Sequence, residues 1–375
     1  MRTRAFAGVV FCLMGLGLLL CCDYMMESRV GYAGPLSGDQ ANLGKEILNG
    51  CTLAVESTNQ AGGFRGRKIE LVSMDDQNLV DKAKETAYAL CRKRPLFVVG
   101  HVDSGCSLEA AKIYRDHRIL MITPTSTNPK LTDSGGGNVF RVCGRDDHQG
   151  FTAAIFLIKH YPSKTVGVIH DNSEYGRGLV QEFIKNYEFL SGVNVLFNEE
   201  VARGDATMEQ AAQKCVAAKP DVIYFGGLAK QGGTFLKELR EQGDNSFFMS
   251  GDGCFEQDFI DTAGAAADGA LITFYPDFKP LVGTGSEAFL KRYQKRFGAE
   301  PSAYAAFGYE AVMVGLNAVA NAASPLSDRT IGDALRRSSY KTFFGILQFD
   351  DKGDLKESPY VMWTVENGKY KELGT

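Results

Sequence analysis

The sequence lacks the basic excess that proteins binding nucleic acids usually carry. Its 41 lysine and arginine residues are outnumbered by 45 aspartate and glutamate residues, which gives a formal net charge of −4. Neutralising a phosphate backbone normally requires an excess of basic side chains on one face. The 42 glycines follow no fixed period, which excludes a fibrous repeat. The length of 375 residues and the hydrophobic content of 44% instead indicate a globular protein of about two domains.

Signatures of catalysis and of metal binding are also scarce. The chain has no G-x-S-x-G motif, and no G-x-G-x-x-G opens a helix, so neither a hydrolase nucleophile nor a dinucleotide site is supported. Its cysteines form no C-x-x-C pair, and its five histidines form no pair three or four residues apart. The segment Gly38–Glu46 differs from a P-loop because five residues separate its glycines and Glu46 stands where Ser or Thr would hold magnesium. We therefore expect no enzyme activity, no metal and no cofactor.

Residues 1–22 have the composition of an export leader. Two arginines precede an uncharged apolar run from Ala5 to Cys22, which is short for a membrane span and typical of a secretory signal. The end of this run, Leu18–Asp23, resembles a bacterial lipobox, although the expected small residue before the lipidated cysteine is missing. We expect a periplasmic or otherwise extracytoplasmic protein with a lipid anchor at Cys21 or Cys22. A plain signal peptide or an uncleaved anchor are the alternatives.

After the leader, short β-branched runs alternate with stretches of helical periodicity. Four expected strands and three expected helices lie, in alternation, at residues 28–33, 43–60, 67–74, 80–93, 96–100, 107–117 and 119–123. The pattern then starts afresh, with five more expected strands at residues 165–170, 193–199, 221–226, 247–250 and 270–275. Strands that are apolar on both faces and separated by helices predict an α/β fold with parallel sheets.

The C-terminal third has a different pattern. Residues 285–339 are mostly helical in character, and residues 344–370 read as short strands and hairpins with a turn at residues 351–354. The chain has no low-complexity linker and no block of like charges. We therefore expect two α/β lobes, with the helical stretch completing one of them.

Polar and small residues follow several of the expected strands. They form the segments His101–Ser107, Pro124–Thr127, Asp171–Gly176 and Gly251–Gly253. Ligands of open α/β sheets bind beyond the carboxyl ends of the strands, where backbone N–H groups and helix N-termini are available. The sequence thus predicts a site for a small ligand at these strand ends.

Several segments in a fixed order resemble one known family. They are residues 33–38, 59–66, 99–104, 119–127, 144–150, 170–176, 224–227 and 350–355. Together they resemble the leucine/isoleucine/valine-binding proteins of bacterial ABC importers, which are periplasmic binding proteins of the type I fold. The resemblance covers nearly the whole chain after the leader. It implies two Rossmann-like lobes that are joined by three crossovers and close on a ligand as a Venus flytrap.

The resemblance also implies how the chain divides. The first lobe would contain residues 28–146 and 276–355, and the second would contain residues 147–275 and 356–375. The crossovers would then lie near Asp146, Tyr275 and Leu355.

The same resemblance assigns binding residues for an amino acid. Ser104, Thr125 and Thr127 fall where the family binds the α-carboxylate, and Asp146 and Asp252 fall where it binds the α-ammonium. The second acidic position often holds Glu in the family, so the shorter Asp252 is a departure. A zwitterion removed from water needs partners for both charges, because an unpaired buried charge is strongly unfavourable.

Four further residues are expected to line the site. Tyr175 matches an aromatic residue of the family's pocket, and Tyr304 is a second candidate for the wall. Leu43 and Leu228 stand where family members often place aromatic residues, and they add no polar group. We therefore expect the ligand to be an aliphatic or otherwise apolar L-amino acid.

The cysteines after the leader leave two alternatives open. The disulfide of the family's founding members would join the positions of Asn78 and Asp103, so it is absent here. A disulfide between Cys91 and Cys106 is one replacement, and buried thiols are the other. The six cysteines concerned are Cys51, Cys91, Cys106, Cys143, Cys215 and Cys254.

The resemblance implies a function without catalysis. We expect a monomeric binding protein that captures an amino acid and delivers it to the permease subunits of an ABC importer in the inner membrane. One alternative is a ligand-sensing receptor module on the same fold. Another is a binding protein for an amide, a urea or an aromatic acid, which two acidic site residues disfavour because such ligands lack an ammonium group.

Overall fold

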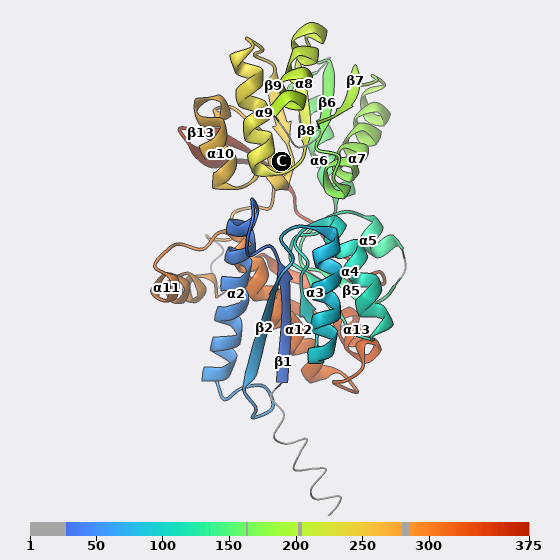
Figure 1. Cartoon of the computed structure of the whole chain (residues 1–375), viewed down its shortest axis with the longest axis vertical. Helices are drawn as coiled ribbons and strands as arrows, with labels where there is room; N and C mark the ends of the chain where they lie inside the picture. Colours follow the sequence, from blue (N-terminus) through green and yellow to red (C-terminus); the bar gives the residue numbers. More distant parts are fainter. Residues whose placement is uncertain (1–27, 135, 163, 202–204, 280–284, 375) are drawn as a thin grey trace, which may run out of the picture.

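The computed structural model describes residues 28–134, 136–162, 164–201, 205–279 and 285–374, so the expected leader lies outside the described residues. Figure 1 shows two α/β lobes stacked along the long axis of the molecule. We call the lobe built on β1 lobe 1 and the lobe built on β6 lobe 2. Within the described ranges no helix is long and apolar enough to cross a membrane.

Lobe 1 is built on a parallel five-stranded sheet of order β2-β1-β3-β4-β5. Its strands are β1 (Ser28–Gly34), β2 (Ile69–Asp75), β3 (Val98–Val99), β4 (Met121–Thr123) and β5 (Val139–Arg141). Its helices are α2 (Ala41–Gln60), α3 (Val80–Lys93), α4 (Ser104–Asp116), α5 (Lys130–Asp133), α11 (Ser286–Phe297), α12 (Ala303–Asn321) and α13 (Asp328–Arg337). Separate apolar cores lie on the two faces of the sheet, one with α2 and α12 and the other with α3 and α4.

Lobe 2 is built on a seven-stranded sheet of order β14-β13-β10-β9-β8-β6-β7. Its strands are β6 (Val166–His170), β7 (Phe197–Glu200), β8 (Val222–Gly226), β9 (Phe247–Ser250), β10 (Leu271–Phe274), β13 (Val361–Glu366) and β14 (Lys369–Gly374). Its helical elements are α6 (Asp146–His160), α7 (Glu174–Ser191), α8 (Asp205–Ala218), α9 (Ala229–Glu241), η1 (Asp252–Cys254), α10 (Gln257–Ala263) and η2 (Gly264–Ala267). Only β13 and β14 run antiparallel to their neighbours.

The chain passes between the two sheets three times within the described elements. It leaves lobe 1 between β5 and α6, returns after β10 to α11, and leaves again after the hairpin of β11 (Ser339–Thr342) and β12 (Gly345–Gln348) to form β13. The α/β fold with two lobes, parallel sheets and three crossovers therefore agrees with the expectation.

Capping residues explain where two helices begin. Asp103 precedes α4, and its side chain accepts hydrogen bonds from the N–H groups of Gly105 and Cys106. Ser173 precedes α7 and accepts one from the N–H of Gly176. Such caps satisfy the free N–H groups of a first helical turn. Helix α4 consequently begins three residues earlier than the expected helix at residues 107–117.

The proposed disulfide between Cys91 and Cys106 is not formed. Cys91 is a free thiol at the end of α3 and is packed in the same apolar core as Ala87 and Leu90. Burial raises the pKa of this thiol to about 11, which keeps it protonated. Of the two alternatives for Cys91 and Cys106, buried free thiols are therefore the correct one.

Candidate ligand-binding site between the lobes

A small cavity of about 40 Å³ lies between the lobes, at the carboxyl ends of strands from both sheets. Residues of both lobes line it: Gln40, Leu43, Asn78, Val102, Asp103, Ser104, Thr125, Tyr175, Leu228, Asp252, Gly253 and Tyr304. This volume holds roughly three water molecules. An amino acid enters only if the lobes separate or the lining side chains move.

Lobe 1 presents hydroxyl groups and a helix N-terminus to this cavity. Ser104 is the first residue of α4, and its Oγ accepts a hydrogen bond of 3.4 Å from the N–H of Asn128. The hydroxyl of Thr125 donates to the carbonyl oxygen of Val102 at 2.9 Å, which fixes the side chain beside Ser104. The N-terminus of a helix and nearby hydroxyls form a favourable environment for an anion.

Asp103 modifies this environment. It lines the cavity and caps α4, while burial raises the pKa of its carboxyl to about 6. Its Oδ1 accepts hydrogen bonds from Gly105 N at 2.8 Å and Cys106 N at 3.2 Å. Two N–H donors therefore offset part of the negative charge on this side.

Lobe 2 presents a carboxylate held by two donors. Oδ1 of Asp252 accepts hydrogen bonds from the hydroxyl of Tyr175 at 2.6 Å and from Nε2 of Gln149 at 3.1 Å. The Tyr175 oxygen in turn accepts from the N–H of Gly253 at 2.8 Å. From lobe 1, the hydroxyl of Tyr304 donates to the backbone carbonyl of Asp252 at 2.8 Å. Asp252 is thus held in one orientation by both lobes.

Asp146 and Thr127 lie behind the cavity rather than on its surface. Both side chains are fully buried, and the N–H of Asp146 donates to the carbonyl of Thr127 at 3.0 Å. Nε2 of Gln149 lies 3.5 Å from Oδ1 of Asp146, so this amide connects Asp146 to Asp252. The side chain of Thr127 favours the ionised form of Asp146 and so opposes the rise of its pKa.

The pKa of both carboxyl groups is raised. Burial raises the pKa of Asp146 well above its usual range, and the charge of Asp252 raises it further. The pKa of Asp252 is also raised, chiefly by burial, although hydrogen bonds from Tyr175 and Gln149 oppose the shift. The positive charge of Arg141 lowers the pKa of Asp146. The guanidinium is, however, already paired, because its Nε donates to Asp354 at 2.6 Å. A cation at this position would favour the ionised form of both carboxyls.

The remaining walls of the cavity are apolar or aromatic. Leu43 and Tyr304 come from lobe 1, and Leu228 and the ring of Tyr175 come from lobe 2. Apolar walls between two polar ends suit a ligand with an uncharged side chain.

Seven of the nine residues expected from the sequence line this cavity. They are Leu43, Ser104, Thr125, Tyr175, Leu228, Asp252 and Tyr304. Polar residues not assigned to the site from the sequence are Gln40, Asn78 and Asp103 on the cavity surface and Gln149 behind it. Two of them had a local signal, because Asp103 directly precedes the helix α4 and Gln149 lies one turn after Asp146 on α6.

Two other kinds of polar cluster were considered, candidate metal ligands and the buried pair of His101 and Asp76. Within the described ranges no group of three or more His, Cys, Asp or Glu side chains is placed to hold a metal ion. A buried His–Asp pair, His101 Nδ1 with Asp76 Oδ2 at 2.6 Å, is completed by Tyr114 OH, 3.1 Å from Nε2. This network is fully buried in lobe 1 and supports the loop between β3 and α4.

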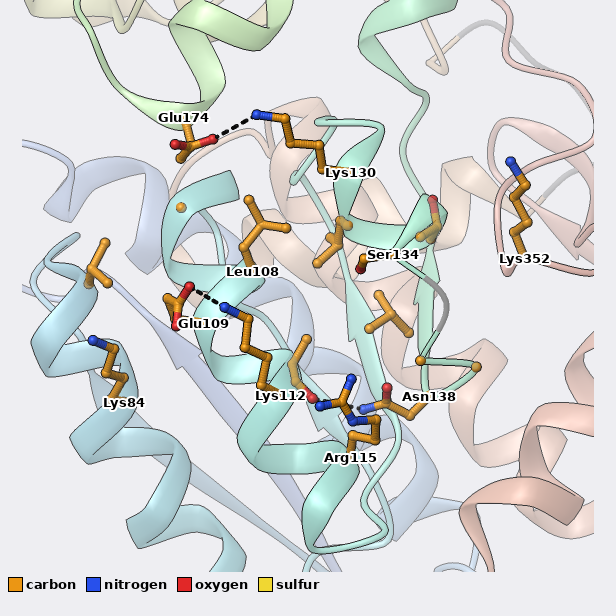
Figure 2. A pocket seen from close by; sticks show the side chains of 18 residues that line it. Lys84, Leu108, Glu109, Lys112, Arg115, Lys130, Ser134, Asn138, Glu174 and Lys352 are labelled. Carbon is orange, nitrogen blue, oxygen red and sulfur yellow. Dashed lines mark hydrogen bonds and ion pairs between the residues drawn. The ribbon is translucent and has the colours of Figure 1, made fainter.

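A larger cavity, of about 820 Å³, lies on the flank of lobe 1. Figure 2 shows its edges, where Lys112 pairs with Glu109 at 2.5 Å and Lys130 pairs with Glu174 at 3.4 Å. None of the nine expected site residues lines it. We therefore assign the ligand site to the smaller cavity, because it combines residues of both lobes, the carboxylate of Asp252 and a helix N-terminus, with the buried Asp146 behind it.

Comparisons with known proteins agree with this fold. A family model described as periplasmic binding protein matches residues 27–369. A Leu/Ile/Val-binding protein homologue of Brucella abortus is 35% identical over 375 residues, which are 99% of each chain.

Two solved structures are similar over most of the chain. A leucine-binding protein from Thermotoga maritima has a TM-score of 0.85 and 28% identity, covering 92% of this chain and 97% of its own. A branched-chain amino acid transporter substrate-binding protein from Streptococcus pneumoniae, in complex with isoleucine, has a TM-score of 0.82 and 25% identity, covering 93% and 100%.

The fold, the interlobe site and the similarity over the full length give one conclusion. The type I arrangement of two α/β lobes positions a binding cavity between them, as suits a family of extracytoplasmic solute-binding proteins. The chain belongs to the periplasmic binding protein family.

Proposed function

We propose that the protein binds an L-amino acid with an aliphatic, branched side chain between its lobes and delivers it to an ABC importer. The observation that carries the proposal is the carboxylate of Asp252, which faces hydroxyls and a helix N-terminus across one cavity and has the buried carboxyl of Asp146 behind it. Opposite charges at the two ends match the two charges of a zwitterion.

The α-carboxylate would bind on the lobe 1 side. Ser104 and Thr125 provide hydroxyls, and the first turn of α4 provides a positive partial charge. Thr127 would act from behind, since its backbone carbonyl holds the N–H of Asp146. We assign the direct contacts to Ser104 and to Thr125, whose hydroxyl would turn from the carbonyl of Val102 to the ligand.

The α-ammonium would bind on the lobe 2 side, directly at Asp252. Gln149 and Tyr175 already orient this carboxylate, and Asp146 adds a second negative charge through Gln149. Bringing two carboxylates together without a cation is repulsive. The ammonium therefore favours the closed arrangement of the lobes, which is a ligand-induced shift of population.

The apolar walls would select the side chain. Leu43 and Leu228 offer surface but no hydrogen-bonding group, so a hydroxyl or amide on the ligand side chain would stay unpaired. The names of the relatives agree with this choice, since the Brucella protein is named for Leu, Ile and Val and the Streptococcus structure contains isoleucine. The latter is also described as a transporter component, which supports delivery to an importer.

Further parts of the proposal rest on the sequence alone. They are a lipid anchor at Cys21 or Cys22, a monomeric state, contact with permease subunits and the lobe boundaries given above. Labelling with a radioactive fatty acid in the native host tests the anchor. Label in a Cys21→Ala, Cys22→Ala double variant would contradict it.

Calorimetric titration tests the ligand assignment. The purified protein is titrated with the twenty L-amino acids and with benzoate, urea and acetamide as representatives of the alternatives. We expect Leu, Ile or Val to bind with a Kd of about 1 µM or lower, equivalent to about −8 kcal/mol. Binding of benzoate or an amide without binding of any amino acid would refute the proposal.

A further inference from the structure

A second cavity opens at the mouth of the interlobe cleft, separated from the ligand cavity by Leu43 and Tyr304, which line both. Its volume is about 660 Å³, and residues of both lobes line it. We call it the mouth cavity. Asn42, near the N-terminal end of α2, and Asp258 of α10 both line it, and Nδ2 of Asn42 donates to Oδ1 of Asp258 at 3.3 Å. None of the ligand assignments above uses it.

The mouth cavity contains a carboxylate with an unsatisfied oxygen. Oε1 of Glu256 is buried and has no hydrogen-bond partner. Burial raises the pKa of Glu256 to about 8, the charges of Asp258 and Glu46 contribute in the same direction, and the charge of Lys230 opposes them only in part. The two neighbouring acids each have a partner. Asp258 lies 3.6 Å from Lys230 Nζ, and Glu46 accepts a hydrogen bond from Ser302.

The other charges on the lining do not neutralise this group. Lys45 and Lys279 are the two lysines of the lining, and Asp277 is a fourth acid beside Glu46, Glu256 and Asp258. Lys279 is engaged with Glu300 at 3.2 Å. The lining therefore carries two more carboxylates than lysines.

An aromatic wall stands beside these carboxylates. Phe255 stacks on Phe274 with 3.9 Å between ring centroids, and it contacts Trp363 at 4.9 Å and Tyr370 at 4.2 Å. All four rings line the cavity. Aromatic rings next to a carboxylate bind organic ammonium groups through cation–π attraction and apolar contact. A metal ion is a poorer match, because the described residues offer no group of three or more ligands for one.

We propose that the mouth cavity binds a small organic monocation of the alkylammonium class, with its charge at Glu256 and its apolar part on the aromatic wall. Glu46 belongs to lobe 1, whereas Glu256 and Asp258 belong to lobe 2. A cation among them stabilises the closed arrangement that Asn42 and Asp258 already support with hydrogen bonds of 3.3 and 3.4 Å. By linkage, it also strengthens binding in the neighbouring ligand cavity.

The chain supplies its own reporter for this site. Trp363 is the only tryptophan in the sequence, lines the mouth cavity and is 8% exposed. Butylammonium chloride is titrated into the purified protein above pH 8, where Glu256 is largely ionised, and the Trp363 emission is followed. We expect a saturable change that neither 1-butanol nor sodium chloride reproduces. An equal response to 1-butanol would overturn the proposal.

Matched variants locate the bound cation. Glu256→Gln keeps the shape and removes the charge, so we expect at least tenfold weaker binding of butylammonium. Glu46→Gln, a second variant, should weaken it about threefold. Glu85→Gln, an exposed change on α3, should leave it unaltered. The Asp252→Asn variant should also keep the response, and its loss there would place the cation in the ligand cavity and refute the inference.

A final measurement tests the coupling separately from the site. Saturating butylammonium should lower the Kd for leucine two- to fivefold in the parent protein and leave it unchanged in the Glu256→Gln variant. Unchanged affinity in the parent protein would refute the coupling. If leucine does not bind at all while the Trp363 response persists, the proposed function fails and the mouth cavity site stands.

Discussion

Asp252 is the residue on which the proposed ligand chemistry depends most. Two donors fix its Oδ1, and a tyrosine of the opposite lobe binds its backbone carbonyl. The carboxylate is therefore oriented before any ligand arrives, which lowers the entropic penalty of binding. Asp252 lines the cavity, whereas Asp146 lies behind Gln149. Asp252 is therefore the acid that we expect to contact the ligand directly.

The first prediction concerns this carboxylate. Asp252→Asn keeps the size and removes the charge, so the affinity for leucine should fall by roughly 30-fold to 1000-fold, or about 2–4 kcal/mol. Calorimetric titration measures the loss, and Asp261→Asn, a change on exposed α10 surface, serves as the control. Equal affinity of the Asp252→Asn variant and the parent protein would exclude the assigned role.

A second prediction follows from Glu310, which is buried on α12 and accepts a hydrogen bond of 2.7 Å from Phe343 N. Burial raises the pKa of Glu310 to about 8, whereas an unfolded glutamate titrates near 4.3. Between these values the native state binds the proton that the unfolded state has lost, so stability falls as pH rises.

Glu310→Gln removes this titration and retains an acceptor for Phe343. Its free energy of unfolding should therefore decrease less with pH, by up to about 1.4 kcal/mol per pH unit between pH 5 and pH 8. Urea denaturation at several pH values measures the two profiles. Parallel profiles of variant and parent would show that Glu310 does not titrate in this range, and Glu85→Gln should give such a parallel profile.

Residues that line the cavity were easier to predict from the sequence than residues that only orient a lining side chain. Ser104, Thr125 and Asp252 follow strands directly, and the resemblance to a family points to them. Gln149 was not predicted as a site residue, because its hydrogen bonds to Asp252 depend on how α6 packs against the loop after β9. The two residues are 103 positions apart in the sequence. Thr127 and Asp146 were found, but their position behind the cavity surface is a result of three-dimensional packing.

Among the elements, α2 and α12 form a close helix pair that supports the lobe 1 side of the site. A Cβ atom on Gly50 of α2 would lie 1.9 Å from the carbonyl oxygen of Ala305 on α12, and one on Gly308 would lie 2.3 Å from that of Ile47. Only glycine allows the two backbones to approach this closely. The contact also positions Leu43 and Tyr304, which belong to these helices and line the cavity.

The third prediction tests this contact. Gly50→Ala forces α2 away from α12, so we expect a loss of about 2–4 kcal/mol in the free energy of unfolding. Gly332→Ala is the control, because its Cβ would meet nothing closer than the flexible Arg336 side chain at 3.2 Å. Helix propensity should make this control neutral or slightly stabilising. Equal stability of the two variants in denaturant would contradict the packing account.

Helices and strands differ in how well the sequence predicts their limits. Helix α3 begins and ends where apolar periodicity places it, while α4 begins earlier because Asp103 caps it. The strand expected at residues 96–100 is reduced to Val98–Val99. Strand limits depend on which neighbours pair with them, and β3 pairs with β1 and β4, which are distant in sequence.

On the scale of the whole molecule, a few polar contacts join the two lobes. Nδ2 of Asn128 donates to the carbonyl of Glu174 at 2.7 Å, and Asn42 and Tyr304 make the contacts to lobe 2 described above. Which faces of the lobes meet follows from such long-range contacts, and no local sequence pattern contains them. The order of strands and helices was predictable, because each βαβ unit carries its own periodicity.

The fourth prediction concerns closure. If the ligand binds both lobes, saturating leucine should lower the radius of gyration measured by small-angle X-ray scattering, because the closed population increases. The Asp252→Asn variant should show no decrease at the same leucine concentration. A radius that stays constant in the parent protein while calorimetry shows binding would mean that the ligand does not close the lobes.

The central claim is that the site recognises a zwitterion, and one pair of titrations tests it most directly. L-Leucine and 4-methyl-2-oxopentanoate share a carboxylate and a branched side chain, but the second has a ketone in place of the ammonium. Calorimetry should give micromolar or tighter binding for leucine and at least a hundredfold weaker binding for the keto acid. Equal affinity for the two compounds would show that Asp146 and Asp252 do not recognise an ammonium group, and would contradict the account.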